Sequence, residues 1–173
     1  GCGVAHCPSS NMRLASGVAP IMSMLTHGVK VGLGVDGSAS NDSSHMLAEA
    51  RQAMLLSRLN SGIHGASRSA PDAPPLMTAR QALSLATRGG AAVLGRQDIG
   101  SLEVGKCADF FAINLNALEY TGAWQDPLAA VVFCASLKAD WTVVGGKVIV
   151  EKGQLRTLDL PTHIEKHQAA SRR

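Results

Sequence analysis

Short apolar runs alternate with amphipathic stretches along the first part of the chain. Residues 3–7 and 29–35 are brief apolar segments bounded by polar or glycine-containing loops, a pattern that predicts two buried strands. Apolar residues recur every three or four positions over residues 18–27 and 45–59, which predicts two helices. The order strand, helix, strand, helix predicts parallel α/β architecture.

The second half of the chain has a different pattern, because every aromatic residue lies beyond Cys107. A helix is expected over residues 78–87, and strands are expected at residues 109–113, 130–133, 141–144 and 147–150, the last two forming a hairpin around Gly145-Gly146. We therefore expect three parts: an α/β part over residues 1–95, a small β domain over 96–159 and a C-terminal helix over 160–173. Residues 61–75 hold three prolines and are expected to form a flexible loop.

Composition places the chain among globular proteins, with 46% hydrophobic and 17% charged residues. The apolar runs are too short to cross a membrane. The net charge is +3, and the sequence has no stripe of basic residues interleaved with aromatic ones, so it gives little support to nucleic-acid binding. The cysteines form no C-x-x-C pair and no targeting segment is recognised, so a cytoplasmic protein with reduced thiols is expected.

The segment VGLGVDG at residues 31–37 has two incompatible interpretations. Its glycines match the letters of a dinucleotide-binding turn, but two of them lie within the strand and the next helix begins several residues too late. In the favoured interpretation, glycines relieve crowding inside a closed barrel, and Asp36 at the end of the strand faces a catalytic mouth. A third possibility is that Asp36 only accepts hydrogen bonds from the loop amides of residues 37–40.

Two further candidates for chemistry are weaker. Cys7 follows His6 and could be a nucleophile, although a small buried apolar residue is the favoured interpretation. His163 and His167 lie four residues apart and could bind a metal together, but they lack a third ligand, so an exposed helix is favoured.

Three motifs in order make the chain recognisable: HCPSSNMRL at residues 6–14, GLGVDG at 32–37 and GSLEVGKCAD at 100–109. With these motifs the chain resembles the metal-dependent amidohydrolases, and more narrowly the aminohydrolases that act on guanine-like and triazine rings. The resemblance implies the C-terminal part of a (β/α)8 TIM-type barrel, namely its last two βα units, followed by part of a small β-sandwich.

The resemblance also implies a reaction. Asp36, after the eighth strand, would be a ligand of one divalent metal ion, zinc or alternatively iron, and would relay a proton from metal-bound water to the leaving amine. Hydroxide on the metal would attack the amine-bearing carbon of an 8-oxoguanine-like purine. Asn11 and Ser38 lie near the expected mouth and are candidate substrate-binding residues, or alternatively stabilise their loops.

Other outcomes stay open. The substrate could be a triazine, a pterin, guanine or a nucleoside, the reaction could be dechlorination, or the chain could be a noncatalytic remnant. The family's other metal ligands cannot be matched, because they follow earlier strands whereas His6 follows the seventh. The resemblance thus implies a missing N-terminal portion of the same barrel as a partner and a homo-oligomer as the complete enzyme. On its own the chain is expected to be inactive, because one carboxylate cannot hold a catalytic metal ion, and to fold poorly, because its two parallel strands have unpaired edges.

Overall fold

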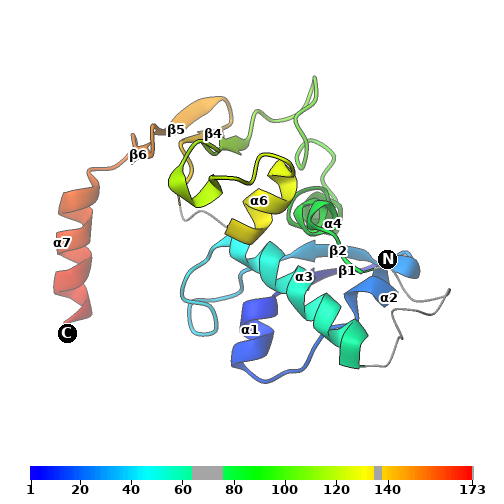
Figure 1. The fold of residues 1–173 in the computed structure, drawn as a ribbon. Coiled ribbons are helices and arrows are strands. Elements are labelled where there is room, and N and C mark those ends of the chain that lie inside the picture. The colour runs from blue at the N-terminus through cyan, green and yellow to red at the C-terminus, as the bar shows by residue number, and fades with distance from the viewer. Residues whose placement is uncertain (64–75, 135–137, 173) are drawn as a thin grey trace.

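The computed structural model describes residues 1–63, 76–134 and 138–172. Its first half contains, in order, β1 (Gly3–His6), α1 (Pro8–Arg13), α2 (Ile21–Thr26), β2 (Lys30–Leu33) and α3 (Met46–Ile63). A continuous helical segment follows, made of α4 (Ala79–Ser84), the π-helical turn η1 (Leu85–Gly89) and α5 (Gly90–Leu94). Figure 1 shows these elements grouped around the two strands.

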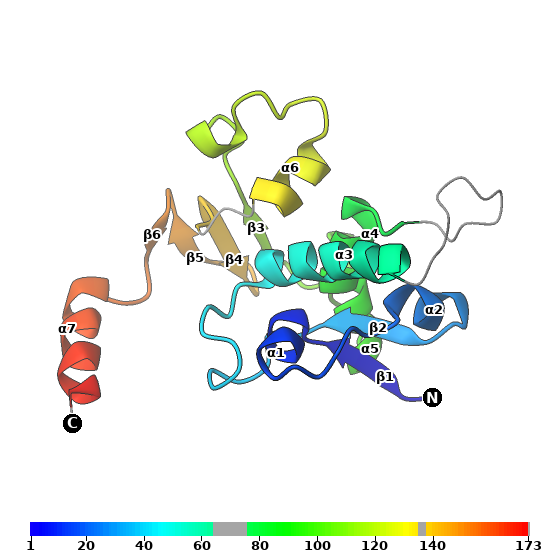
Figure 2. The same cartoon turned by 60° about the horizontal axis from the view of Figure 1, so that its bottom comes forward.

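The two strands of the first half pair in parallel, as the sequence predicts. Gly3 lies opposite Lys30, and His6 lies opposite Leu33. Both strands therefore end at the same edge, where β1 leads into α1 and β2 leads into the loop that contains Asp36 (Figure 2). This shared edge is where the carboxyl ends of parallel strands place functional residues in α/β proteins.

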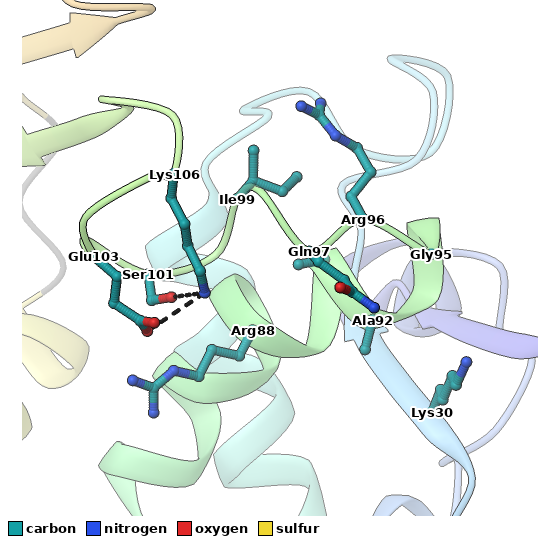
Figure 3. A pocket seen from close by; sticks show the side chains of 11 residues that line it. Lys30, Arg88, Ala92, Gly95, Arg96, Gln97, Ile99, Ser101, Glu103 and Lys106 are labelled. Atoms are coloured by element: carbon teal, nitrogen blue, oxygen red, sulfur yellow. Dashed lines mark hydrogen bonds and ion pairs between the residues drawn. The ribbon is translucent and has the colours of Figure 1, made fainter.

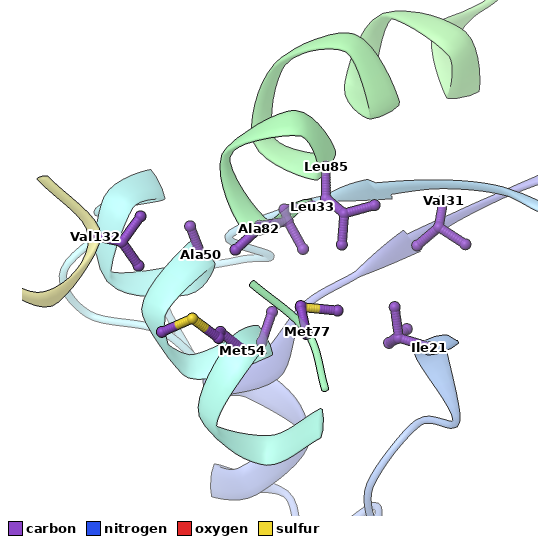
Figure 4. Packing of buried hydrophobic residues seen from close by; sticks show 10 residues of the cluster. Ile21, Val31, Leu33, Ala50, Met54, Met77, Ala82, Leu85 and Val132 are labelled. Atoms are coloured by element: carbon purple, nitrogen blue, oxygen red, sulfur yellow. The ribbon is translucent and has the colours of Figure 1, made fainter. Parts of the chain in front are cut away.

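The hydrophobic core lies on one face of this strand pair. Val31 and Leu33 alternate along β2 and so point to the same side, where they meet helices α2, α3 and α4 (Figure 4). The core extends to α6 (Pro127–Cys134) of the second half, because Val132 and Met54 both belong to it with 0% exposure. The full cluster contains Ile21, Val31, Leu33, Ala50, Ala53, Met54, Met77, Ala82, Leu85 and Val132.

On the opposite face of β2, close packing explains why residue 32 is a glycine. A β-carbon built there would lie 2.8 Å from the Cα of Gly90 and 2.9 Å from its nitrogen, both of them backbone atoms. Conversely, a β-carbon on Gly89 would lie 2.3 Å from the carbonyl oxygen of Val31. The crowding at Gly32 therefore comes from the helical segment that crosses the strand, whereas the sequence suggested side chains inside a barrel.

The second half forms one antiparallel sheet of four strands. The order is β3 (Phe110–Ala112), β4 (Trp141–Val144), β5 (Lys147–Glu151) and β6 (Gln154–Leu155). Gly145 and Gly146 have φ values of 55° and 77°, which fits the two-residue hairpin predicted between β4 and β5. The short β6 was not predicted, and a second layer that would make this sheet a β-sandwich remains a prediction.

The strand predicted at residues 130–133 is wrong, because these residues belong to helix α6. The carboxylate of Asp126 accepts a hydrogen bond of 2.9 Å from the backbone N–H of Ala129, and Pro127 occupies the first helical position. A short apolar run cannot distinguish a buried strand from a buried helix by its period. The Asp-Pro pair before the run was the informative signal.

Other boundaries differ by a few residues. Helix α1 begins at Pro8, where a loop was expected, and a 3₁₀ turn, η2 (Leu118–Tyr120), was not predicted. Helix α3 continues to Ile63, so the flexible loop expected at residues 61–75 begins inside a helix and its remainder lies outside the described residues. The expected final helix is present as α7 (Leu160–Ser171), which stands away from the rest of the chain in both views (Figures 1 and 2) and has no buried residue.

No helix in the described ranges is both long enough and apolar enough to cross a membrane.

Candidate functional site

Asp36 lies at the edge where both parallel strands end, three residues beyond Leu33. Its backbone has a φ of 63°, in the left-handed region that few residues other than glycine adopt. Aspartate tolerates this conformation better than most side chains, and such positions cluster at functional sites when the surroundings hold them in place. Helix α3 begins only at Met46, nine residues after Gly37. A dinucleotide fingerprint requires a helix to begin at its third glycine, which would be Gly37, so that interpretation does not fit.

Three hydrogen bonds hold the carboxylate of Asp36. Its Oδ2 accepts from the hydroxyl of Ser10 at 2.6 Å and from that of Ser40 at 3.1 Å, and its Oδ1 accepts from the backbone N–H of Gly37 at 2.8 Å. The two hydroxyl oxygens lie 2.9 Å apart. The interpretation of Asp36 as a pure acceptor of loop amides is therefore incomplete, because one bond comes from Ser10 in α1, after the neighbouring strand.

These bonds change the acidity of Asp36. The hydroxyl of Ser10, then the amide of Gly37 and then the hydroxyl of Ser40 hold the pKa of Asp36 below its ordinary value. Hydrogen bonds to the charged form of a carboxyl group favour that form. Asp36 is consequently an anion at neutral pH, which suits both a metal ligand and a proton acceptor.

The sequence reasoning missed Glu49, which is 0% exposed in the first turn of α3. Its Oε2 accepts from the backbone N–H of Ser9 at 3.0 Å, and its Oε1 accepts from the side-chain amide of Asn41 at 2.8 Å. The predicted helix over residues 45–59 placed Glu49 away from its apolar face. A signal for its burial was nevertheless present, because Glu49 lies three residues after Met46 and four before Ala53, the spacing of residues that share a helix face.

The two candidate substrate-binding residues flank Asp36 in different elements. Ser38 is exposed in the loop two residues after Asp36, and Asn11 is half-buried in α1, next to Ser10. Ser10 itself was not among the predicted site residues. Substrate contacts by Asn11 and Ser38 remain predictions.

His6 and Cys7 end β1 beside this network. Burial lowers the pKa of His6, and the nearby Glu49 carboxylate opposes that change. Burial raises the pKa of Cys7, and the charges of Asp36 and Glu49 raise it further. A thiol with a raised pKa carries little thiolate at neutral pH, so these surroundings disfavour the nucleophilic interpretation of Cys7.

The described ranges 1–63, 76–134 and 138–172 contain no group of three His, Cys, Asp or Glu side chains that could hold a metal ion. Asp36 fits a metal site as one carboxylate ligand and cannot form such a site alone. His163 and His167 lie on the exposed helix α7, in agreement with the surface interpretation.

A separate hollow lies near the amino end of β2, opposite the end that leads to Asp36. It is lined by Lys30, Arg88, Arg96, Glu103 and Lys106, among others (Figure 3). Within it, the Lys106 ammonium donates to the Ser101 hydroxyl at 2.6 Å and lies 3.4 Å from a carboxylate oxygen of Glu103. Because the functional residues of parallel α/β sheets lie at the carboxyl ends of the strands, this hollow is not the candidate site.

Comparisons with known proteins agree with the resemblance inferred from the motifs. The profile of the amidohydrolase family matches residues 1–149. The chain is 48% identical over 171 residues to 8-oxoguanine deaminase of Pseudomonas aeruginosa, covering 99% of this chain and 35% of that protein. The chain thus spans about a third of the length of the curated relatives it matches.

Solved structures support the fold. An atrazine chlorohydrolase of Arthrobacter aurescens TC1 complexed with zinc matches with a TM-score of 0.85 and 34% identity, over 96% of this chain and 35% of that one. An adenosine deaminase of Xanthomonas campestris with bound zinc matches with a TM-score of 0.85 and 33% identity, over 98% and 37%. The α/β elements therefore form part of a larger amidohydrolase-type structure. Since the family profile spans most of the chain and a relative is 48% identical across nearly all of it, the protein belongs to the amidohydrolase family.

Proposed function

We propose that this chain is the C-terminal part of a metal-dependent enzyme that hydrolytically deaminates an aromatic heterocycle, with an 8-oxoguanine-like purine as the substrate. The observation that carries the proposal is the placement of Asp36, an anion fixed by Ser10 and Ser40 at the carboxyl ends of two parallel strands. The 48% identity to an 8-oxoguanine deaminase supports the choice of substrate.

The metal would be held by Asp36 together with ligands from the part of the relatives' length that this chain does not span. Zinc is the proposed ion, because two similar structures contain it. When bound, a divalent ion lowers the pKa of a coordinated water to about 7. Asp36 is an anion at that pH, because hydrogen bonds hold its pKa below the ordinary value, and only the ionised carboxylate can receive a proton.

The role of this chain's residues in catalysis is then proton transfer and orientation. Ser10 and Ser40 both bind Oδ2 and so fix the plane of the Asp36 carboxylate. Oδ1 accepts the Gly37 amide and has capacity for a further partner. A carboxylate placed in this way can take a proton from water and give it to an amine that leaves as ammonia.

Hydrolytic removal of a substituent from a triazine ring is the second candidate, because the chlorohydrolase with a TM-score of 0.85 acts on atrazine according to its name. The two candidates share the role of Asp36 and differ in the leaving group. They are separated by product analysis, since one releases ammonia and the other chloride or an amine.

The experiment is an assay of the complete enzyme against 8-oxoguanine, guanine, a pterin, adenosine and chlorinated or aminated triazines. Ammonia release with the highest kcat/KM for 8-oxoguanine is the expected result. Asp36→Asn should lower kcat by about 10²–10⁴-fold, the usual contribution of a positioned acid or base. The control is Asp42→Asn, an exposed carboxylate of the same loop whose ion pair with Arg13 lies at the surface.

Two outcomes would contradict the proposal. Full turnover by Asp36→Asn would remove the proton-transfer role of Asp36. Complete enzyme that contains no divalent ion, as measured by elemental analysis, and that releases neither ammonia, amine nor chloride would favour the noncatalytic alternative.

A further inference from the structure

The segments after β1 and β2 form the candidate site, and both are called loops below, although the first contains helix α1. Glu49 connects these two loops. Ser9 belongs to α1, which follows β1, and Asn41 belongs to the loop that follows β2. One oxygen of the Glu49 carboxylate accepts from the Ser9 backbone at 3.0 Å, and the other accepts from the Asn41 side chain at 2.8 Å. A single buried side chain of α3 thus spans both loops.

The two partners of Glu49 are the chain neighbours of the residues that bind Asp36. Ser9 immediately precedes Ser10, and Asn41 immediately follows Ser40. Ser10 and Ser40 in turn both place their hydroxyls on Oδ2 of Asp36. The positions of both hydroxyls therefore depend on contacts made by the two oxygens of Glu49.

The surroundings of Glu49 make this arrangement rigid. Glu49 is 0% exposed and Asn41 is 5% exposed, so neither side chain can exchange its partner for bulk water without opening the structure. Asn41 is fixed on its other side as well, because its Oδ1 accepts from the backbone N–H of Ser43 at 3.2 Å. Glu49 lies in the first turn of α3, where the helix dipole favours a negative side chain.

We propose that Glu49 is a positioning residue for Asp36: by holding Ser9 and Asn41, it fixes the two hydroxyls that orient the Asp36 carboxylate. Glu49 does not touch Asp36 and acts through Ser10 and Ser40. The inference rests on the proposed function for its effect on turnover, whereas its effect on the two loops is independent of any reaction.

The test begins with Glu49→Gln in the complete enzyme, which keeps the size of the side chain. An amide has one acceptor oxygen, so its NH₂ group must face either the Ser9 N–H or the Asn41 NH₂, and two donors then oppose each other. Rotation of the Asn41 amide would relieve that conflict only by breaking the bond to Ser43. The carboxylate is therefore required by the pattern of donors around it.

The matched second variant is the double substitution Glu49→Gln with Asn41→Asp. The new carboxylate at position 41 can accept from the amide of position 49 and still accept from the N–H of Ser43, while the amide oxygen at position 49 accepts from Ser9. The number of acidic groups is unchanged. The double variant should restore the wild-type behaviour of the two loops if the pattern of donors and acceptors around position 49 holds them. It should not do so if only the volume of the side chain at position 49 matters.

Hydrogen exchange is the readout that needs no activity. In Glu49→Gln the amides of residues 9–12 and 36–43 should exchange roughly tenfold faster, as expected for a lost buried hydrogen bond, and the double variant should return toward the wild type. In turnover, kcat should fall in Glu49→Gln while KM stays close to the wild-type value, because Glu49 does not touch the substrate, and kcat should return in the double variant. Glu165→Gln, a matching change on the exposed helix α7, should alter neither.

The outcomes are separable from those of the proposed function. If the wild-type enzyme turns over none of the heterocycles, the proposed function fails, and hydrogen exchange still decides the role of Glu49. Unchanged exchange in both loops of Glu49→Gln overturns the inference. If Glu49→Gln does not fold, a folded double variant with wild-type exchange supports the inference, and a double variant that is unfolded or unprotected overturns it.

Discussion

The hydroxyl of Ser10 donates a hydrogen bond of 2.6 Å to Oδ2 of Asp36, across 26 residues of sequence. The register of the parallel strands brings these residues together, because His6 of β1 lies opposite Leu33 of β2 and both strands end at the same edge of the sheet. The conformation of the first loop thereby sets the ionisation of a carboxylate in the second.

Ser10→Ala should therefore raise the pKa of Asp36 toward its ordinary value, because the variant loses the largest stabilisation of the anion. A raised pKa means that Asp36 becomes protonated at a higher pH, so the acid limb of the kcat/KM profile of the complete enzyme should move upward. Ser40→Ala should cause a smaller shift in the same direction, since its contribution ranks below that of Ser10. If Ser10→Ala and the wild type have identical pH profiles of kcat/KM, the acid limb does not report the ionisation of Asp36.

Cys7→Ala should retain most of the wild-type kcat. Burial and the neighbouring carboxylates raise the pKa of the Cys7 thiol, so the thiolate that a nucleophile needs forms only above the ordinary thiol range. Alkylation of Cys7, followed by mass spectrometry across pH, should accelerate only at correspondingly high pH. A loss of turnover as large as that of Asp36→Asn would revive Cys7 as the nucleophile.

Two adjacent glycines should respond in opposite ways to alanine. Gly89→Ala places a methyl group 2.3 Å from the carbonyl oxygen of Val31, and the backbones must separate, at a cost of about 1–3 kcal/mol in the free energy of unfolding. Gly90→Ala meets nothing within 4 Å in a helical backbone and should stabilise the protein by up to about 1 kcal/mol. Urea unfolding midpoints of the two variants would test this, and equal shifts would contradict the close crossing of helix and strand.

Much of the first half could be predicted from local patterns. The apolar runs at residues 3–7 and 29–35 predicted the parallel strands, and the apolar periodicity of residues 45–59 predicted α3. Asp36 is a candidate from the sequence because it follows a buried strand, and its role in the site stays a prediction. The interpretation of residues 130–133 failed because burial on both sides of α6 removes the period that distinguishes a helix from a strand.

The partners of Asp36 were harder to predict than Asp36 itself. Ser10 looks like an ordinary loop serine until the strand register is known, since its bond to Asp36 is set by tertiary structure. Glu49 stands on an apolar face where a charge argues against burial, and only the two donors from separate loops make that burial possible. The sequence of one protein shows that a serine or a glutamate stands at such a position. It does not show which distant residue will be its hydrogen-bond partner, and that partner gives the residue its role.

The two oxygens of Asp36 are chemically distinct. In the part of the chain that the structure describes, Oδ2 accepts two hydroxyl groups whereas Oδ1 accepts one backbone amide, so electron density is withdrawn more strongly from Oδ2. Oδ1 is then the more basic atom, and an incoming proton should settle there, on the side of the carboxylate away from both serines. Under the proposed function, the serine pair thus selects which atom of a nominally symmetric group receives the proton.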